Sequence, residues 1–291
     1  MDPDYLPFHE NPKKPDYIPP VGAVDSHCHV FGPANLFPYH PNRKYTPCDA
    51  PKESLFALRD FLGFEKNVIV QASCHGTNNA ALVDALNAAD GAARGVSVLS
   101  PDVSDEELNA LNLAGVRGVR FNFVKRLVDS TPRSVFETLA SRVKPLGWHI
   151  VVYFESPDLE DLRPFLESLA RDQIVVVDHM GRPDVGLGVE SKEFQSFISL
   201  LDQNENIWTK VSCPERLTNQ APDYSDVTPF GKALVETFPD RVLWGTDWPH
   251  PNMTSHIPDD GSLVDVIPEI AVNDDLRRRL LVDNPMRLYW K

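Results

Sequence analysis

Eight short apolar segments recur along the chain, and they constrain its fold more than any other feature. Each has the length of a strand and is rich in β-branched residues; they are 23–30, 66–73, 94–100, 116–123, 148–155, 174–180, 206–212 and 241–247. Several are hydrophobic at consecutive positions, as in Val68-Ile69-Val70. Continuous hydrophobicity is typical of strands that are buried on both faces of a parallel sheet. The segments therefore predict a parallel sheet that is covered on both sides.

Amphipathic stretches lie between the apolar segments and predict helices at 53–62, 78–89, 104–113, 134–143, 158–170, 191–203, 228–238 and 273–282. Two of them open with Ser-x-x-Glu, at Ser104 and Ser134, which matches the capping box of a helix start. Eight strands alternating with helices predict an α/β fold, a (β/α)8 TIM-like barrel. A doubly wound open sheet is the alternative, but no glycine-rich phosphate loop follows the first strand.

The first residues of the chain differ from the rest in their proline content. Proline is incompatible with a helix interior or a central strand, and here it stands at Pro3, Pro7, Pro12, Pro15, Pro19 and Pro20. This spacing predicts an extended arm. We therefore divide the chain into an N-terminal arm at 1–22, packed on the barrel, and a single barrel domain at 23–291.

Composition and charge exclude several classes of function. The formal net charge is −14, which disfavours nucleic acid as a partner because phosphate binding needs clustered Lys and Arg. No apolar run approaches the length of a membrane span, and the N-terminus lacks the pattern of a secretory signal, so we expect a cytoplasmic protein. The four cysteines are scattered without paired spacing, which argues against a disulfide framework and a thiolate zinc site.

Catalytic residue types stand where the first and the last apolar segments end. His27 and His29 are one residue apart, so both imidazoles point to the same side of a strand. Asp247 ends the eighth segment. The active site of a (β/α)8 barrel lies at the C-terminal ends of its strands. If the first and eighth strands are neighbours, these three side chains converge on one pocket, which indicates an enzyme.

Other strand ends add polar side chains to the same predicted pocket: Ser73, Arg120, Asn122, Tyr153, His179 and Ser212. Four arginines, Arg120, Arg126, Arg182 and Arg216, lie at or just beyond strand ends. The planar guanidinium pairs with carboxylates, so converging arginines favour a substrate with more than one acid group. Any one of them could equally form a structural ion pair, and we expect about two of the four to contact substrate.

The His-x-His motif, His179 and Asp247 together resemble the amidohydrolase superfamily of distorted (β/α)8 barrels. Longer segments, including DSHCHVFGP, RGVRFNFVKRLVD, VVDHMGRPDV and VLWGTDWPHPNM, look like the lactonases of that superfamily that act on 2-pyrone-4,6-dicarboxylate in the bacterial catabolism of aromatic lignin fragments. The similarity covers nearly the whole chain. It implies reversible opening of a dicarboxylated lactone ring, with 4-oxalomesaconate as the product.

The resemblance also implies residue roles. Asp247 would activate the attacking water as general base. His27, His29, His179 and Tyr153 would surround the carbonyl oxygen and stabilise the oxyanion. The residues that match substrate-contacting positions are Tyr45, Ser73, Arg120, Arg126, Arg216 and Asn252. Arg182 and His250 lie nearby in the sequence without an assigned role.

The resemblance implies that no metal is needed. Metal-dependent relatives place a carbamoylated lysine on the fourth strand and a histidine on the fifth, whereas here these strands carry Arg120, Asn122, Tyr153 and Glu155. This departure argues against a binuclear site. A single zinc held by His27, His29, His179 and Asp247 is chemically possible. The lactonases that the chain resembles work without metal, and we therefore expect no cofactor.

Three other functions stay open from the sequence. The protein could hydrolyse another anionic lactone, such as a sulfomuconolactone, with one zinc. It could be a decarboxylase of the same superfamily. It could also be a non-catalytic binding protein that retains the barrel pocket. In each case the partner is a small molecule, and the sequence does not determine the oligomeric state.

Overall fold

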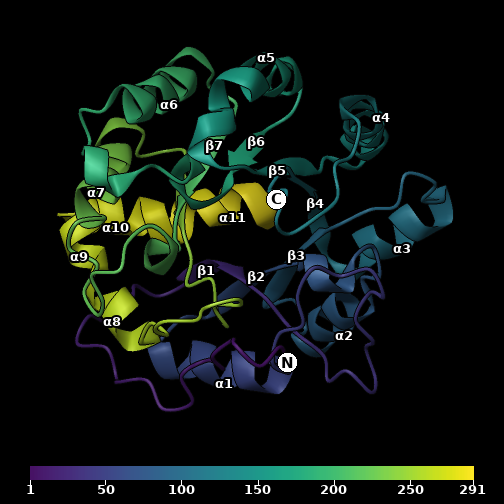
Figure 1. Ribbon diagram of the computed structural model, residues 1–291, viewed down its shortest axis with the longest axis horizontal. Coiled ribbons are helices and arrows are strands. Elements are labelled where there is room, and N and C mark those ends of the chain that lie inside the picture. Colours follow the sequence, from purple (N-terminus) through teal and green to yellow (C-terminus); the bar gives the residue numbers. More distant parts are fainter.

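Eight parallel strands form a barrel in the computed structural model, which describes residues 1–291 (Figure 1). They pair in sequence order: β1 (Val24–Cys28), β2 (Lys66–Val70), β3 (Ala93–Ser97), β4 (Val116–Asn122), β5 (His149–Tyr153), β6 (Val175–Val177), β7 (Ile207–Val211) and β8 (Val242–Trp244). Each strand coincides with one of the predicted apolar segments. The expected (β/α)8 barrel is confirmed, and the open-sheet alternative is wrong.

The barrel closes just beyond the ends of β1 and β8. The Asp247 amide donates to the His27 carbonyl at 2.8 Å, and the His29 amide donates to the Trp248 carbonyl at 2.8 Å. A β-carbon on Gly245 would lie 2.4 Å from the His27 backbone nitrogen, so this close approach requires glycine. Closure therefore brings the two ends of the sequence together at the site that carries the histidines and Asp247.

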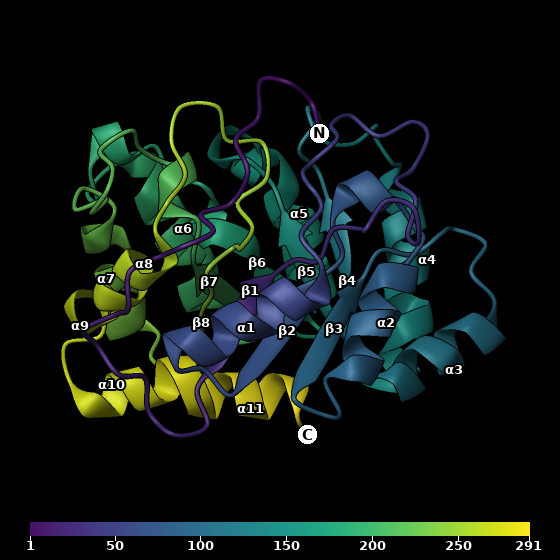
Figure 2. The same ribbon diagram turned by 90° about the horizontal axis from the view of Figure 1, so that it is seen from below.

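Helices surround the strands, as both views show (Figures 1 and 2). Those that follow β1 to β7 are α1 (Lys52–Leu62), α2 (Ala80–Ala88), α3 (Asp105–Ala114), α4 (Arg133–Val143), α5 (Leu159–Ala170), α6 (Lys192–Gln203) and α7 (Thr228–Thr237). After β8 come α8 (Asp260–Asp265), α9 (Ile267–Ile270), α10 (Asp274–Arg278), a π-helical turn at Arg279–Asp283, and α11 (Asn284–Tyr289). The predicted helix at 273–282 corresponds to α10 and this turn, whereas α8, α9 and α11 were not predicted.

The two predicted capping boxes have different outcomes. Ser104 caps α3, where its hydroxyl accepts from the Glu107 amide at 3.1 Å. The prediction at Ser134 is wrong, because α4 begins one residue earlier and Pro132 takes the capping position. Proline pre-sets a backbone angle that suits a helix start, and this favours the earlier beginning.

The end of the barrel opposite the site is filled by apolar side chains. Valines from five strands pack with Trp208, Leu243 and, from α11, Leu288 and Tyr289. Figure 2 shows α11 running beneath the strands at this end. The lower half of the barrel is thus a packed core, and only the C-terminal ends of the strands are available for a ligand.

Residues 1–23 contain turns and bends but no helix or strand. This segment contacts the loop that follows β8, where the Leu6 amide donates to the Met253 carbonyl at 2.8 Å and Phe8 packs on Trp248 with ring centroids 4.9 Å apart. Further along, Lys13 pairs with Asp265 of α8 at 2.6 Å. None of the helices combines the length and hydrophobicity that a membrane span requires.

Candidate active site

A pocket of about 350 Å³ lies at the C-terminal ends of the strands. Most of the residues predicted for the site line it: His29, Tyr45, Ser73, Arg120, Tyr153, His179, Arg216, Asp247 and Asn252. Ala72, Leu127 and Pro251 complete the wall. Four residues that the sequence analysis placed in the pocket do not line it: His27, Asn122, Arg126 and Ser212.

Asp247 lies where the polar contacts of the pocket meet. Its Oδ1 is 3.1 Å from His29 Nε2 and 3.3 Å from His27 Nε2, and its Oδ2 is 3.4 Å from Arg216 Nε. Cys213 donates its thiol proton to Oδ2 at 3.0 Å. Burial by itself would raise the pKa of Asp247, but the hydrogen bond from His29 and the positive neighbours hold this pKa well below its usual value. The carboxylate is therefore ionised and able to accept a proton.

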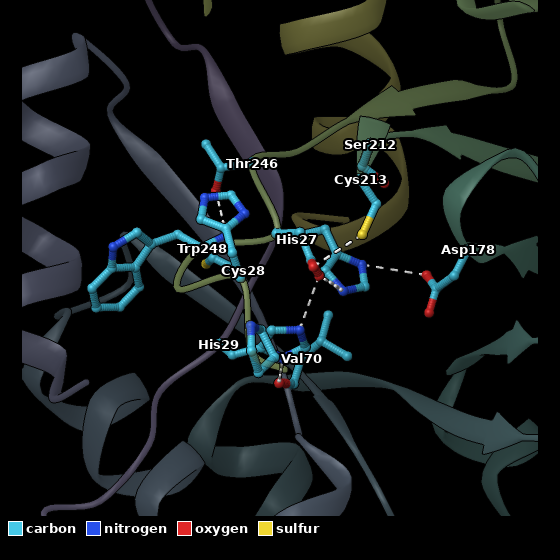
Figure 3. A network of polar contacts seen from close by, with 12 residues as sticks. His27, Cys28, His29, Val70, Asp178, Ser212, Cys213, Thr246 and Trp248 are labelled. Carbon is cyan, nitrogen blue, oxygen red and sulfur yellow. Dashed lines mark hydrogen bonds and ion pairs between the residues drawn. The ribbon is translucent and has the colours of Figure 1, made fainter. Parts of the chain in front are cut away.

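The two histidines of the His-x-His motif make different contacts, although their rings lie only 5.0 Å apart. His29 Nδ1 lies 2.8 Å from the Val70 carbonyl (Figure 3). A carbonyl only accepts, so Nδ1 donates there, and Nε2 is directed at Asp247. The Val70 carbonyl therefore fixes the orientation of the His29 ring toward the carboxylate.

His27 is completely buried behind Asp247. Its Nδ1 lies 3.3 Å from Asp178 Oδ1, a contact drawn in Figure 3, and 3.0 Å from the ammonium nitrogen of Lys210. Burial and the charge of Lys210 lower the pKa of His27 to about 3, so the ring is neutral. The prediction assigned His27 to the substrate carbonyl; in the structure its ring is buried against Asp247 and does not line the pocket.

His179 and Tyr153 form the wall opposite His29. His179 Nδ1 is 2.8 Å from the Ser212 hydroxyl, and the His179 ring meets the Tyr153 ring edge-on with centroids 5.1 Å apart. Arg182 donates to the Tyr153 phenol oxygen at 2.8 Å. Because a guanidinium can only donate, the phenol keeps its own proton for a ligand. Arg182 is thus a support for Tyr153, a role that the sequence did not reveal.

The four strand-end arginines fall into distinct environments. Arg120 and Arg216 line the pocket, and Arg120 also pairs with buried Asp178 at 2.9 Å. Arg126, which was predicted to bind substrate, has a side chain that is 43% exposed and lies 3.4 Å from Glu155. The structure brings Leu127, its neighbour in the chain, to the pocket wall instead.

Backbone conformations with positive φ cluster around the site. His179, Met180 and Arg182 after β6, Cys213 after β7, and Asp247, His250 and Asn252 after β8 all have φ between 53° and 68°. Such conformations cost of order 1–3 kcal/mol each in residues other than glycine, and they concentrate where function demands a particular side-chain direction. Here they turn the chain sharply at the strand ends, and His179, Asp247 and Asn252 of this group face the pocket.

His250 belongs to a buried charge cluster under the pocket. Its Nδ1 is 3.2 Å from Glu215 and its Nε2 is 3.1 Å from Asp260, so both ring nitrogens donate to carboxylates. Burial would lower the pKa of His250, but the two carboxylates raise it from 6.5 to about 10. The His250 side chain is completely buried and does not line the pocket, so we assign it a supporting role for the loop after β8.

The raised pKa of His250 predicts a pH dependence of stability. Because the folded state binds this proton more tightly than the unfolded state, the contribution is fully present below pH 6.5 and is lost as the pH rises through about 10. We expect the free energy of unfolding of the native protein to exceed that of His250→Gln at pH 6, and the difference to shrink by pH 10. Urea unfolding of both proteins measures it. A difference that is constant with pH would contradict the assignment.

Several side chains of the site were missed in the sequence. Asp178 directly precedes His179, and Lys210 stands inside the apolar segment Ile207-Trp208-Thr209-Lys210-Val211. A lysine in a strand buried on both faces is rare, and that was the available signal. Cys213 and Glu215 offered no comparable signal, because each follows a strand end in an ordinary loop sequence.

The fold and the site together define an amidohydrolase-type barrel. The Amidohydrolase family model matches residues 24–290, so the chain belongs to this family. A curated relative from Comamonas testosteroni, a 2-pyrone-4,6-dicarboxylate hydrolase, is 57% identical over 99% of this chain and 96% of its own length. The expected resemblance to these lactonases is therefore confirmed.

Two further relatives extend the comparison. The 4-sulfomuconolactone hydrolase of Hydrogenophaga intermedia is 34% identical over 97% of this chain and 92% of its own length. A crystal structure of a probable 2-pyrone-4,6-dicarboxylic acid hydrolase from Acinetobacter baumannii, with citric acid bound, has a TM-score of 0.79 and 28% identity. It covers 93% of this chain and all of the other. Lactone hydrolases are thus found both among the relatives by sequence and among the similar solved structures.

Proposed function

We propose that this protein hydrolyses the lactone ring of 2-pyrone-4,6-dicarboxylate to 4-oxalomesaconate, and that the reaction runs in both directions. The observation that carries the proposal is the 57% identity to a hydrolase of this substrate over almost the entire chain. The pocket supports it independently. It combines Asp247 with two hydrogen-bond donors, Tyr153 and His179. It also contains two arginines, Arg120 and Arg216, and hydrolysis of an anionic lactone needs groups of these three kinds.

Asp247 acts in this proposal as the general base. It takes a proton from water, whose oxygen attacks the lactone carbonyl carbon and forms a tetrahedral intermediate. Tyr153 and His179 face the pocket and donate hydrogen bonds to the developing oxyanion. The ring C–O bond then breaks, and the leaving enolate oxygen takes the proton back from Asp247. His27, which lies behind Asp247, acts by positioning this carboxylate.

Arg216 and Arg120 hold the two carboxylates of the substrate, with Tyr45, Ser73 and Asn252 along the same wall. Arg216 is also one of the charges that hold the pKa of Asp247 low. A substrate carboxylate at Arg216 offsets that charge and raises the pKa of Asp247 toward the range in which a general base works best. Substrate binding thus prepares the base for its task.

The protein works without a metal ion in this proposal, and in the cytoplasm. All four cysteines are unpaired, as expected for a protein in a reducing compartment. The test is an assay of purified protein on 2-pyrone-4,6-dicarboxylate and on 4-sulfomuconolactone, together with metal analysis of the same sample. We expect turnover of the pyrone with less than stoichiometric metal. Preference for the sulfonated lactone, or activity that a chelator abolishes and zinc restores, would overturn the proposal.

A decarboxylase of the same fold would release carbon dioxide. We expect none during turnover, because the scissile bond in the proposed reaction is the ring C–O bond. A coupled assay for carbon dioxide run beside the lactonase assay distinguishes the two reactions.

Arg126 provides a test of substrate recognition outside the observed pocket wall. Its ion pair with Glu155 is exposed, so separating the two costs at most about 1 kcal/mol. We propose that Arg126 leaves Glu155 to bind a substrate carboxylate. Arg126→Met should then raise KM about tenfold with little change in kcat, as expected for loss of a charge-assisted hydrogen bond to the bound substrate. Glu155→Gln is the matched variant and should leave KM unchanged or lower it. Native kinetics in Arg126→Met would exclude this residue from substrate binding.

A further inference from the structure

Lys210 is the one lysine in the barrel interior beside the site, and the proposed chemistry does not use it. It stands on β7 with a fully buried side chain. Its ammonium nitrogen lies 3.0 Å from His27 Nδ1 and 3.1 Å from Asp178 Oδ1. A buried charge is costly unless it is paired. Asp178 already has Arg120 as a cationic partner, so the negative charge of the Asp178 carboxylate would be balanced without Lys210.

The contact between Lys210 and His27 determines where the single proton of a neutral imidazole lies. An ammonium group has three N–H donors and no acceptor, so His27 Nδ1 must accept. The other ring nitrogen, Nε2, faces an oxygen of the Asp247 carboxylate, which has lone pairs and no proton to offer. The His27 proton therefore resides on Nε2, which faces Asp247 Oδ1 at 3.3 Å.

A metal-binding histidine has the opposite arrangement. It donates its outer N–H to a carboxylate or a carbonyl, and the lone pair of the other nitrogen binds the metal. His29 has this arrangement, because its Nδ1 donates to the Val70 carbonyl. His27 could have it too, because Asp178 lies 3.3 Å from its Nδ1. The ligand atoms of His27, His29 and Asp247 all lie within 4.8 Å of one another, which is close enough for one ion. Position alone would allow zinc, but the protonation of His27 does not fit it.

We propose that Lys210 is a positioning residue that keeps His27 in the Nε2–H form, so that the ring nitrogen facing Asp247 carries a proton and has no lone pair for a metal ion. Without the ammonium group, Asp178 would accept the proton at Nδ1, and the Nε2 lone pair would become free. One buried lysine on β7 thus separates a metal-free site from a zinc site built from the same histidines and aspartate. The proposal rests on the metal-free part of the proposed function and is independent of which lactone is the substrate.

The first test needs no variant. Nitrogen-15 NMR of histidine-labelled native protein, with the His27 signals assigned through His27→Gln, reports which ring nitrogen carries the proton. We expect a protonated Nε2 and an unprotonated Nδ1 in His27, and a protonated Nδ1 in His29. A protonated Nδ1 in His27 of the native protein would overturn the proposal.

The second test replaces Lys210 with an apolar side chain of similar length. Lys210→Met should move the His27 proton to Nδ1 and tighten zinc binding about 10- to 100-fold, the range typical of changes to groups that hold a metal ligand. Zinc content after dialysis, titration calorimetry with zinc chloride and the NMR signals of His27 measure the effect. Thr209→Val, a buried change at the neighbouring position on β7, is the matched control and should behave as the native protein.

Zinc affinity of Lys210→Met equal to that of the native protein would contradict the proposal. If this variant does not fold, the zinc affinity of Lys210→Gln and the NMR result for the native protein test the proposal in its place. None of these readouts uses a lactone. Failure of the substrate assay therefore leaves the NMR and zinc results interpretable, and the two proposals can fail separately.

Discussion

Asp247→Asn is expected to lower kcat for lactone hydrolysis about 10²- to 10⁴-fold, the range that a general base contributes. The amide has almost the shape of the carboxylate but cannot accept the proton of the attacking water. The loss should appear in kcat and in kcat/KM together, because the interaction is made in the transition state. Steady-state kinetics on 2-pyrone-4,6-dicarboxylate measures it.

Binding should survive this substitution, since Arg120 and Arg216 are unchanged. Titration calorimetry with an unreactive aromatic dicarboxylate, such as pyridine-2,4-dicarboxylate, measures it separately from turnover. Exposed Asp184→Asn serves as the matched control and should have native kinetics. Unchanged kcat in Asp247→Asn would remove this residue from the mechanism. Ligand binding without any turnover by the native protein would instead favour a non-catalytic binding protein over an enzyme.

His250→Gln is expected to destabilise the protein by about 3–5 kcal/mol at neutral pH, because it removes the cation that lies between two buried carboxylates and leaves Arg216, 3.9 Å from Glu215, as the remaining cationic contact. The partners are Glu215 and Asp260, and all three side chains are inaccessible to solvent. Urea unfolding monitored by circular dichroism measures the loss. His9→Gln, at an exposed position in the N-terminal segment, should change stability by less than about 0.5 kcal/mol.

The two variants act on different properties, which separates catalysis from support. His250 stands three residues after Asp247 in the same loop, and its side chain is completely buried, so its loss should lower the stability of the fold well before it alters kcat at low temperature. Native stability in His250→Gln would show that the charge cluster contributes nothing to the fold. A fall in kcat at unchanged stability would instead give His250 a role in the reaction.

The periodicity of the chain predicted the barrel well because the physical constraint is local. A strand buried on both faces must be apolar along its length, and a helix packed on a sheet must be amphipathic, so each element leaves its own pattern. The misses have local reasons as well. With Pro132 at the capping position, α4 starts before the expected cap at Ser134. The helix α11 is too short, and too interrupted by Pro285, to show a helical period.

The site was predictable to the extent that it is made of strand ends. Seven of the nine predicted residues that line the pocket stand at or just beyond strand ends, which the parallel strands of a closed barrel deliver to the same end. Tyr45 and Asn252 lie in loops and were predicted from the family resemblance alone. Arg126 and His27 fell outside this wall for different reasons. Arg126 follows its strand by several residues, so the loop conformation decides its direction, and His27 is covered by Asp247, a residue far away in the sequence.

What the sequence determined by itself is therefore the barrel, the end of the barrel that carries the chemistry, and the identity of the acid, imidazole and guanidinium groups found there. What only the tertiary structure decided is how protons are distributed among them. Lys210, Asp178 and His27 come from three different strand segments, and their contacts of 3.0 to 3.3 Å exist only after the barrel closes. Hydrogen bonds act over such short distances that no spacing along the chain encodes them.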